Sequence, residues 1–153
     1  MEEKKTVIQD DSEKTLTKRQ KARAEVFQLL FERDFQKEKS AEDVYRDALS
    51  ARTFAEDPYI LSTFLGTVAH EEEILAEIDR HAVGWKRNRI SAVSLNAMKL
   101  CIYEMRYTEI PLRVALNEAL LLVKRFDDEK ARPFVNGVLN AVLQELLPTR
   151  GDK

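Results

Sequence analysis

Apolar residues recur at helical spacing over the last part of the chain, in two runs that end at Phe126 and Leu147. Pro111 opens the first run, and a proline suits the first turn of a helix, where its missing N–H has no intrahelical partner. An acidic break at residues 127–129 separates this run from the second, which begins at Phe134. The spacing of both runs predicts amphipathic helices. We expect them to form an antiparallel hairpin at the centre of a bundle.

Two features of this hairpin carry further expectations. The acidic break favours the N-terminus of the last helix, because negative charge there complements the helix dipole. Gly137 interrupts the second apolar run, and a glycine inside a helix costs about 1 kcal/mol relative to alanine. We therefore expect another backbone to approach the helix closely at Gly137.

Helical spacing also marks four segments before the hairpin, whereas the alternation typical of strands is absent. The segments span residues 17–36, 40–54, 57–84 and 90–107. Glutamates at 71–73 interrupt the apolar stripe of the third segment, so this helix is either long and partly exposed or bent there. The pattern predicts an all-α fold. Its expected core includes Phe27, Leu30, Phe64, Leu100, Tyr103, Leu120, Val138 and Leu143.

Length and composition narrow the class of protein. A chain of 153 residues is long enough for one domain with a substantial core. We assign that domain to residues 17–148, with a flexible polar tail at 1–16 and a short tail at 149–153. No apolar run approaches the roughly 18 residues of a membrane span, and no secretory signal is visible. A single cysteine fits a reducing cytoplasm.

The sequence offers little support for catalysis, a metal or a cofactor. Its four glycines stand apart, so it has no Gly-rich phosphate loop. His70 and His81 are the only imidazoles, and Glu77 precedes His81 by one helical turn. Histidines on a charged surface are more often solvated than metal-bound. Cys101 lies among apolar residues without an adjacent base, so we interpret it as a small buried hydrophobe.

The start of the first helix is unusually basic. Lys18, Arg19, Lys21 and Arg23 place four cations within six residues, where the helix dipole favours anions. Arg19 and Arg23 are one turn apart, so they could line a ridge that grips successive RNA phosphates. The alternative is an ordinary solvated helix end. The net charge is only −2, so a polyanion site must be a local patch. A second cluster, at residues 86–89, would extend that patch only if it folds nearby.

Four stretches in a fixed order are distinctive. They are Arg19-Gln-Lys-Ala-Arg23 followed by Gln28-Leu-Leu-Phe31, then Lys99-Leu-Cys-Ile-Tyr-Glu-Met105, Ile110-Pro-Leu-Arg-Val-Ala-Leu-Asn-Glu-Ala119 and Phe134-Val-Asn-Gly-Val-Leu139. In this order and spacing the chain resembles the NusB family of bacterial transcription antitermination factors, from about Thr17 to Leu147. The last two stretches are the most specific.

The resemblance implies a compact bundle of about seven helices in two packed subdomains. It implies a non-catalytic factor that binds boxA, a short single-stranded element of nascent ribosomal RNA leader transcripts. It also implies pairing with NusE, the small-subunit ribosomal protein that serves as a second antitermination factor. Together they would act in the RNA polymerase antitermination complex and help the polymerase read through.

The resemblance also indicates RNA-binding residues. The arginine-rich motif of the family falls on Arg19, Lys21 and Arg23, with Gln20 in place of one arginine. Phe134 corresponds to an aromatic residue near the RNA surface, although its spacing equally suits plain core packing. The candidate RNA-binding residues are Lys18, Arg19, Lys21, Arg23, Gln28, Arg132 and Phe134.

Three positions depart from the family pattern. Asp127 follows Phe126 where the family usually has glycine, and Lys130 follows Glu129 where an acid is usual. Ser94 stands near the start of the fourth main helix, where an acidic residue is often found on the NusE side. Lys130 makes the loop less acidic, which could favour RNA. Ser94 bears on the detail of the NusE contact and not on its existence.

Two other function classes compete with an RNA-binding adaptor. The first is a helical protein-interaction module with little RNA affinity of its own, which salt-dependent binding to boxA RNA would distinguish. The second is enzymatic, because NusB-like domains also precede a catalytic domain in ribosomal RNA cytosine methyltransferases. This sequence contains no cofactor-binding βαβ region, so we do not expect methyltransferase activity.

Overall fold

The computed structural model describes residues 15–52 and 54–150, and this part of the chain contains seven α-helices and no strand. The helices are α2 (Lys18–Arg33), α3 (Ala41–Ala51), α4 (Pro58–Ala69), α5 (Glu71–His81), α6 (Ala92–Tyr107), α7 (Leu112–Phe126) and α8 (Ala131–Arg150), with one short 3-10 turn, η1 (Arg87–Arg89). The expected all-α fold is confirmed. Most of the expected N-terminal tail, residues 1–14, lies outside the described residues. None of the described helices has the length and apolar character needed to cross a membrane.

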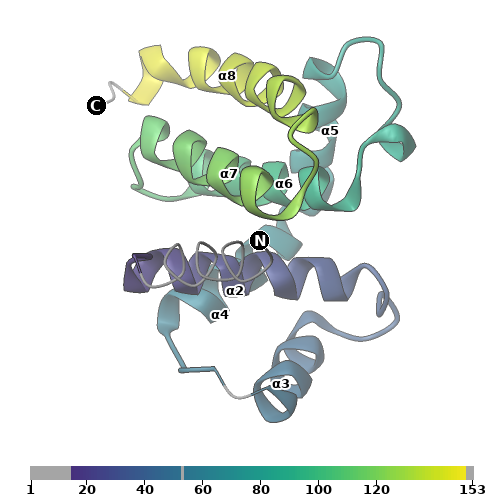
Figure 1. Ribbon diagram of the computed structural model, residues 1–153, viewed down its shortest axis with the longest axis vertical. Helices are drawn as coiled ribbons and strands as arrows, with labels where there is room; N and C mark the ends of the chain where they lie inside the picture. Colours follow the sequence, from purple (N-terminus) through teal and green to yellow (C-terminus); the bar gives the residue numbers. More distant parts are fainter. Residues whose placement is uncertain (1–14, 53, 151–153) are drawn as a thin grey trace, which may run out of the picture.

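The helices form two packed groups (Figure 1). The helices α2, α3 and α4 contact one another in the lower half of the view, and α5 to α8 form the upper half. The two groups meet where α2 and α4 contact α6, which also contacts α5, α7 and α8. The hairpin of α7 and α8 is present as expected, but α6 and not the hairpin occupies the centre of the protein.

Polar side chains immediately before the helices explain where several of them begin. At α2, Thr17 and Gln20 form a capping box, in which each backbone N–H donates to the other side chain at 3.0 Å. Ser40 and Ser91 cap α3 and α6 with their hydroxyls, and the Asp57 carboxylate caps α4. Each cap satisfies a backbone N–H that has no intrahelical partner.

The segment expected at 57–84 consists of two helices. His70 separates α4 from α5 and has a non-helical conformation, with φ −103° and ψ 18°. Glutamates at 71–73 form the first turn of α5, where their negative charge complements the helix dipole. Of the two alternatives for this segment, the bent one is therefore correct.

The last helix is longer than expected at both ends. It begins at Ala131 and continues through Arg150, so residues 149 and 150 are helical and do not belong to a tail. Arg150 donates hydrogen bonds to the backbone carbonyls of Met105 and Ile110. These bonds hold the end of α8 against the connection between α6 and α7.

The expected core is observed. Phe27, Leu30, Phe64, Leu100, Val138 and Leu143 are buried, and Tyr103 and Leu120 are partly buried against them. Cys101 is 1% exposed, as expected of a small buried hydrophobe, and burial raises the pKa of its thiol. The thiolate is therefore disfavoured, which makes Cys101 a poor nucleophile.

The close approach expected at one glycine occurs at another. A Cβ built on Gly137 would meet nothing within 4 Å, so the close backbone approach expected there is wrong for this chain alone. A Cβ on Gly66 would lie 2.2 Å from the Tyr103 hydroxyl oxygen. Gly66 is thus the position where α4 and α6 come too close for a side chain, although the sequence pattern gave no sign of it.

Buried ionic groups join the two subdomains. Lys99 of α6 is 3% exposed, and its Nζ donates to Glu71 Oε2 at 2.7 Å. Arg33, at the end of α2, donates to Glu71 Oε1 at 3.0 Å. Burial opposes ionisation of Glu71, but Lys99 and Arg33 outweigh it and hold the pKa of this carboxyl below its usual value. One carboxylate therefore connects helices from both groups.

We expect the Glu71 contacts to lose strength in acid. The pKa of Glu71 is lower in the folded state, so its contribution to stability is complete above the unfolded value of about 4.3 and disappears as the pH falls through the folded value. The destabilisation caused by Glu71→Gln should therefore shrink from pH 7 to pH 3, as measured by urea unfolding. Glu72→Gln, which changes an exposed neighbour, is the control. A Glu71→Gln effect that stays constant with pH would contradict this prediction.

Candidate nucleic-acid interface

The fold divides the basic cluster at the start of α2 into separate environments. Lys18 and Lys21 are exposed, and neither side chain forms a hydrogen bond or ion pair within the described part of the chain. They are three residues apart, so they share one side of the helix. Arg19 is also exposed, but it lies on the side of α2 that faces α4. Arg23 is 4% exposed.

The burial of Arg23 corrects the expected Arg19–Arg23 ridge. The Arg23 Nε donates to both carboxylate oxygens of Glu104, at 3.2 and 3.1 Å, and Arg23 Nη1 lies 3.5 Å from Glu118 Oε1. Burial raises the pKa of the Glu104 carboxyl, although Arg23 opposes this effect. Arg23 is thus committed to two glutamates inside the protein, and it has no exposed surface with which to grip a phosphate beside Arg19.

Tyr59 of α4 connects Arg19 to this buried network. The Arg19 guanidinium carbon lies 4.1 Å from the centre of the Tyr59 ring, which is cation–π distance. The Tyr59 hydroxyl donates to Glu104 Oε2. Burial, together with the charge of Glu104, raises the pKa of Tyr59. The neutral, hydrogen-bonded phenol therefore provides a fixed platform that orients Arg19 at the surface.

The departure at Gln20 also has a structural role. Its side-chain amide nitrogen donates to both carboxylate oxygens of Glu118, at 3.2 and 3.1 Å, while its carbonyl completes the capping box with Thr17. The start of α2 is therefore fixed to α7 by a neutral amide. This contact holds the Gln20 side chain against α7.

A depression of about 390 Å³ lies between α2 and the end of α7. Lys21 and Gln28 line it from α2, and Arg125 and Phe126 line it from α7. The Phe126 ring stacks on Phe27, with the ring centres 5.3 Å apart, which holds the two helices together. Lys21 and Gln28, which the sequence indicated as RNA-binding candidates, thus face Arg125 and Phe126, which it did not.

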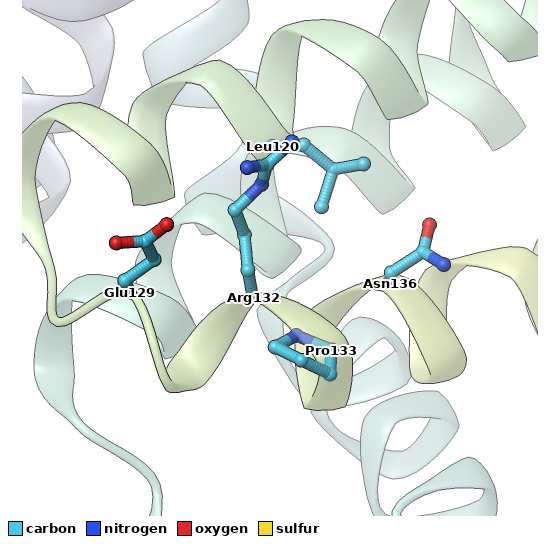
Figure 2. Close-up of a pocket in the computed structure, with 5 residues that line it drawn as sticks. All are labelled: Leu120, Glu129, Arg132, Pro133 and Asn136. Atoms are coloured by element: carbon cyan, nitrogen blue, oxygen red, sulfur yellow. The ribbon is translucent and has the colours of Figure 1, made fainter.

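A second depression of about 390 Å³ lies at the start of α8 (Figure 2). Arg132 projects from α8 toward Leu120 of α7, between Glu129 and Asn136. Arg132 is exposed as a whole residue. The candidate residue Arg132 therefore lies against α7, on the side of α7 opposite to the α2 depression.

The outward face of α7 connects the two depressions. At 100° per residue, Arg113, Leu121 and Lys124 fall between the side of α7 that contacts α2 and the side that contacts α8, and all three are exposed. We call the combined region the α2–α7–α8 surface. It comprises Lys18, Lys21, Gln28, Arg113, Leu121, Lys124, Arg125, Phe126 and Arg132. The surface combines cations with the exposed apolar side chains of Leu121 and Phe126, and single-stranded nucleic-acid sites commonly combine positive charge with aromatic side chains.

Phe134 does not belong to this surface. It is partly buried and contacts Trp85, with the ring centres 5.0 Å apart, on a different side of α8 from Arg132. The second basic cluster, between α5 and α6, lies far from the start of α2 (Figure 1). In that cluster Arg87 pairs with Asp79 at 2.5 Å. Phe134 and the basic cluster at residues 86–89 are therefore both separate from Lys18 and Lys21.

Two of the three departures from the family pattern contact each other. Asp127, after α7, accepts hydrogen bonds from the hydroxyls of Ser91 and Ser94 at 2.5 and 2.6 Å. Burial opposes ionisation, but these bonds outweigh it and hold the pKa of Asp127 below its usual value. Asp127 therefore places a carboxylate at the start of α6, within hydrogen-bond distance of Ser94.

Two residues considered above for metal binding, His81 and Glu77, lie together with Glu145 in an ion-pair network. Glu77, His81 and Glu145 offer ligand atoms within 4.8 Å of one another. Arg106 pairs with Glu77, and Arg80 pairs with Glu145 at 2.6 Å. Because two arginines neutralise the carboxylates, the cluster connects α5, α6 and α8 as a structural network.

The part of the chain that matches known proteins lies within the helical fold. A model of the NusB family matches residues 20–144. The chain belongs to the NusB family. It is 37% identical to the transcription antitermination protein NusB of Solibacter usitatus over 86% of this chain and 92% of that protein. It is 36% identical to NusB of Bacillus subtilis over 84% of this chain and 97% of that protein.

Solved NusB structures share the fold. T. maritima NusB has a TM-score of 0.76 at 29% identity, covering 84% of this chain and 92% of that one. A chain from the complex of antitermination factors NusB and NusE with double-stranded RNA has a TM-score of 0.73 at 26% identity, covering 83% of this chain and 96% of that one. The helical arrangement described above is therefore that of the NusB family.

Proposed function

We propose that this chain is a transcription antitermination factor that binds boxA RNA together with NusE. The observation that carries the proposal is its membership of the NusB family over residues 20–144. The α2–α7–α8 surface supports it, because Lys18, Lys21 and Arg132 are exposed cations in a protein of net charge −2. Such cations bind phosphates without needing a basic protein overall.

The role that we propose is non-catalytic, carried out in the cytoplasm as part of the RNA polymerase antitermination complex. Its residues are Lys18, Lys21, Gln28 and Arg132 for the α2–α7–α8 surface, with Arg19 at its margin. We place Arg23 behind them as a positioning residue, since it holds Glu104, and Glu104 holds the Tyr59 hydroxyl beneath Arg19.

The proposal predicts a specific change in salt dependence. Removing one phosphate interaction with a single strand makes the plot of log affinity against log salt shallower by about 0.7. Replacing Lys18 and Lys21 with alanine should therefore weaken boxA binding at low salt and flatten the slope by about 1.4. Fluorescence anisotropy with labelled boxA RNA over a salt series measures both quantities.

A charge-matched control separates a local site from a general effect of charge. Lys37→Ala with Arg46→Ala removes the same two charges from exposed positions after α2 and on α3, and it should leave the slope unchanged. Equal binding by the parent and the Lys18, Lys21 variant at every salt concentration would rule out the α2–α7–α8 surface. Absence of RNA binding by the parent, with NusE binding retained, would favour the protein-interaction module.

The same anisotropy measurement of boxA binding is repeated in the presence of NusE. Adding NusE should raise the RNA affinity, because a second protein contributes its own contacts and excludes water from the interface. The same titration with a duplex compares the two forms of RNA, since one related complex contains double-stranded RNA. Equal RNA affinity with and without NusE would remove the support for a cooperative complex.

A further inference from the structure

The depression between α2 and the end of α7 lies where the chain enters α2. Lys21, Ala24 and Gln28 line it from one side of α2, since they are spaced three and four residues apart. Leu16, which precedes the N-cap Thr17, lines the same depression. The segment before Leu16 is therefore joined to the folded protein at the edge of this depression.

The lining of the depression combines apolar surface with positive charge. Phe126 is 37% exposed, and the Arg125 guanidinium carbon lies 4.7 Å from the centre of its ring. Lys21 adds a second cation. Glu25, an acidic residue of the lining, accepts a hydrogen bond from Arg52 Nε at 2.7 Å, so its charge is offset by Arg52 and not by Lys21. An occupant that fits this depression therefore combines apolar groups with negative charge.

The segment before α2 has that composition. Val7 and Ile8 form an apolar pair, and Asp10, Asp11 and Glu13 place three carboxylates within four residues. Opposite charges attract most strongly at short range, and the basic start of α2 follows these carboxylates directly in the chain. The chain thus supplies a complementary occupant of its own.

The segment is also long enough to cover the depression. Nine residues lead back from Leu16 to Val7, and they span up to about 30 Å when extended, at roughly 3.3 Å per residue. The depression follows α2 as far as Gln28, about 15 Å from the start of the helix at 1.5 Å per residue. Val7 can therefore reach Phe126, which lines the depression from α7.

We propose that residues 7–13 dock in the depression between α2 and α7 and compete with RNA for the α2–α7–α8 surface. The apolar pair covers the exposed Phe126 ring, and the three carboxylates face Lys18 and Lys21. This inference rests on the proposed function and adds a built-in competitor to it. Lys21 is both an RNA-binding candidate and part of the depression, so RNA binds there only when the segment leaves.

A tethered segment competes well even when its own affinity is weak. A short connection gives an effective concentration in the millimolar range. Docking with a dissociation constant of about 0.1–1 mM therefore lowers the apparent RNA affinity about 2- to 10-fold, because only the undocked fraction binds. The same segment from a second copy of the chain has no such advantage at micromolar protein concentration.

Two variants of the full chain test the competition. Asp10→Asn, Asp11→Asn and Glu13→Gln together remove the three carboxylates. Val7→Ser with Ile8→Ser removes the apolar pair and leaves the charge unchanged. Each variant should bind boxA RNA about 2- to 10-fold more tightly than the parent, as measured by fluorescence anisotropy.

A charge-matched control separates docking from a general effect of negative charge. Glu38→Gln, Glu42→Gln and Glu56→Gln together remove three exposed carboxylates around α3, which lies away from α7 and α8 (Figure 1). This variant should bind RNA like the parent, because exposed charges are screened beyond about 10 Å at ordinary salt concentration. A gain equal to that of the acidic-segment variant would overturn the docking site. So would parental affinity in the variant that lacks the apolar pair.

A nitroxide label locates the segment without RNA. Thr6→Cys supplies a thiol for the label, whereas Cys101 is 1% exposed and does not react with it. The label should broaden the amide signals of Ala24 and Gln28 and spare those of α3, and boxA RNA should restore the broadened signals. A mixture of nitroxide-carrying chain with isotope-labelled parent detects docking between two copies. Equal broadening in that mixture would overturn docking within one chain.

The outcomes separate this inference from the proposed function. If Ala24 and Gln28 are not broadened, or if RNA does not reverse the broadening, the competition is wrong even when the Lys18, Lys21 variant loses RNA affinity as proposed. If the broadening is present but neither the parent nor any variant binds RNA, the proposed function fails, and the competition fails with it.

Discussion

Replacing Glu104 with alanine is expected to destabilise the protein by about 3–5 kcal/mol, because it leaves a buried cation without its partner. Glu104 is 1% exposed and accepts hydrogen bonds from Arg23 and from the Tyr59 hydroxyl. Its removal leaves Arg23, which is 4% exposed, with only the longer contact to Glu118. Urea unfolding followed by circular dichroism measures the resulting decrease in stability.

Two controls test whether the unpaired charge is the cause. Glu109→Ala removes an exposed carboxylate and should change the free energy of unfolding by less than about 0.5 kcal/mol. Replacing Arg23 and Glu104 together with leucine should restore much of the stability, because a buried ion pair replaced by apolar groups is often neutral. If the double variant is as unstable as Glu104→Ala, packing and not the unpaired charge explains the effect.

The same network makes Arg23 unsuitable as a simple probe of RNA binding. Arg23→Ala leaves Glu104 buried beside an uncharged side chain, so reduced RNA binding by this variant would reflect both unfolding and the displacement of Arg19. Replacing Arg19 and Arg23 together would therefore disturb the fold as well as any ligand contact. Lys18 and Lys21 are better probes, because both side chains are exposed.

The second large effect is expected in the apolar core. Leu143 is 0% exposed on the inner side of α8. Leu143→Ala should lower the free energy of unfolding by about 2–5 kcal/mol. The removed methyl groups no longer contribute the free energy of their burial on folding, and a cavity remains in their place. Thermal and urea unfolding both measure this change.

Leu121 provides a matched control on the neighbouring helix. It is 40% exposed on the outward face of α7, so Leu121→Ala should cost much less than Leu143→Ala under the same conditions. The comparison holds the chemical change constant and varies only burial. A decrease of less than about 0.5 kcal/mol for Leu143→Ala would contradict the packing of α8 against α6 and α7.

Local physical chemistry explains what the sequence by itself determined. Helical periodicity, the N-caps at Thr17 and Ser40, and the absence of strand patterns are sufficient to identify the helices. These signals act within a few residues, so they can be read from the chain directly. The four NusB-like stretches likewise indicate the family, which the match to residues 20–144 confirms.

The tertiary structure decided which polar residues are available to a ligand. Arg19 and Arg23 look equivalent in sequence, yet Glu104, 81 residues after Arg23, removes Arg23 from the surface. Similarly, Trp85 and Phe134 become neighbours only when the α5–α6 loop packs beside the start of α8. A local pattern specifies which residues are polar or aromatic, but it does not specify their distant partners.

Contacts between distant parts of the chain also determine the structural roles of two glycines and of two departures from the family pattern. Gly66 is required because Tyr103 of α6 occupies the space of its Cβ, whereas Gly137, which sequence reasoning singled out, faces open space. Ser94 and Asp127 appear in sequence as two independent departures, and in the structure they share one hydrogen bond of 2.6 Å. Secondary structure was predictable because its causes lie within one or two helical turns, whereas burial, close approach and charge pairing depend on residues far apart in the chain.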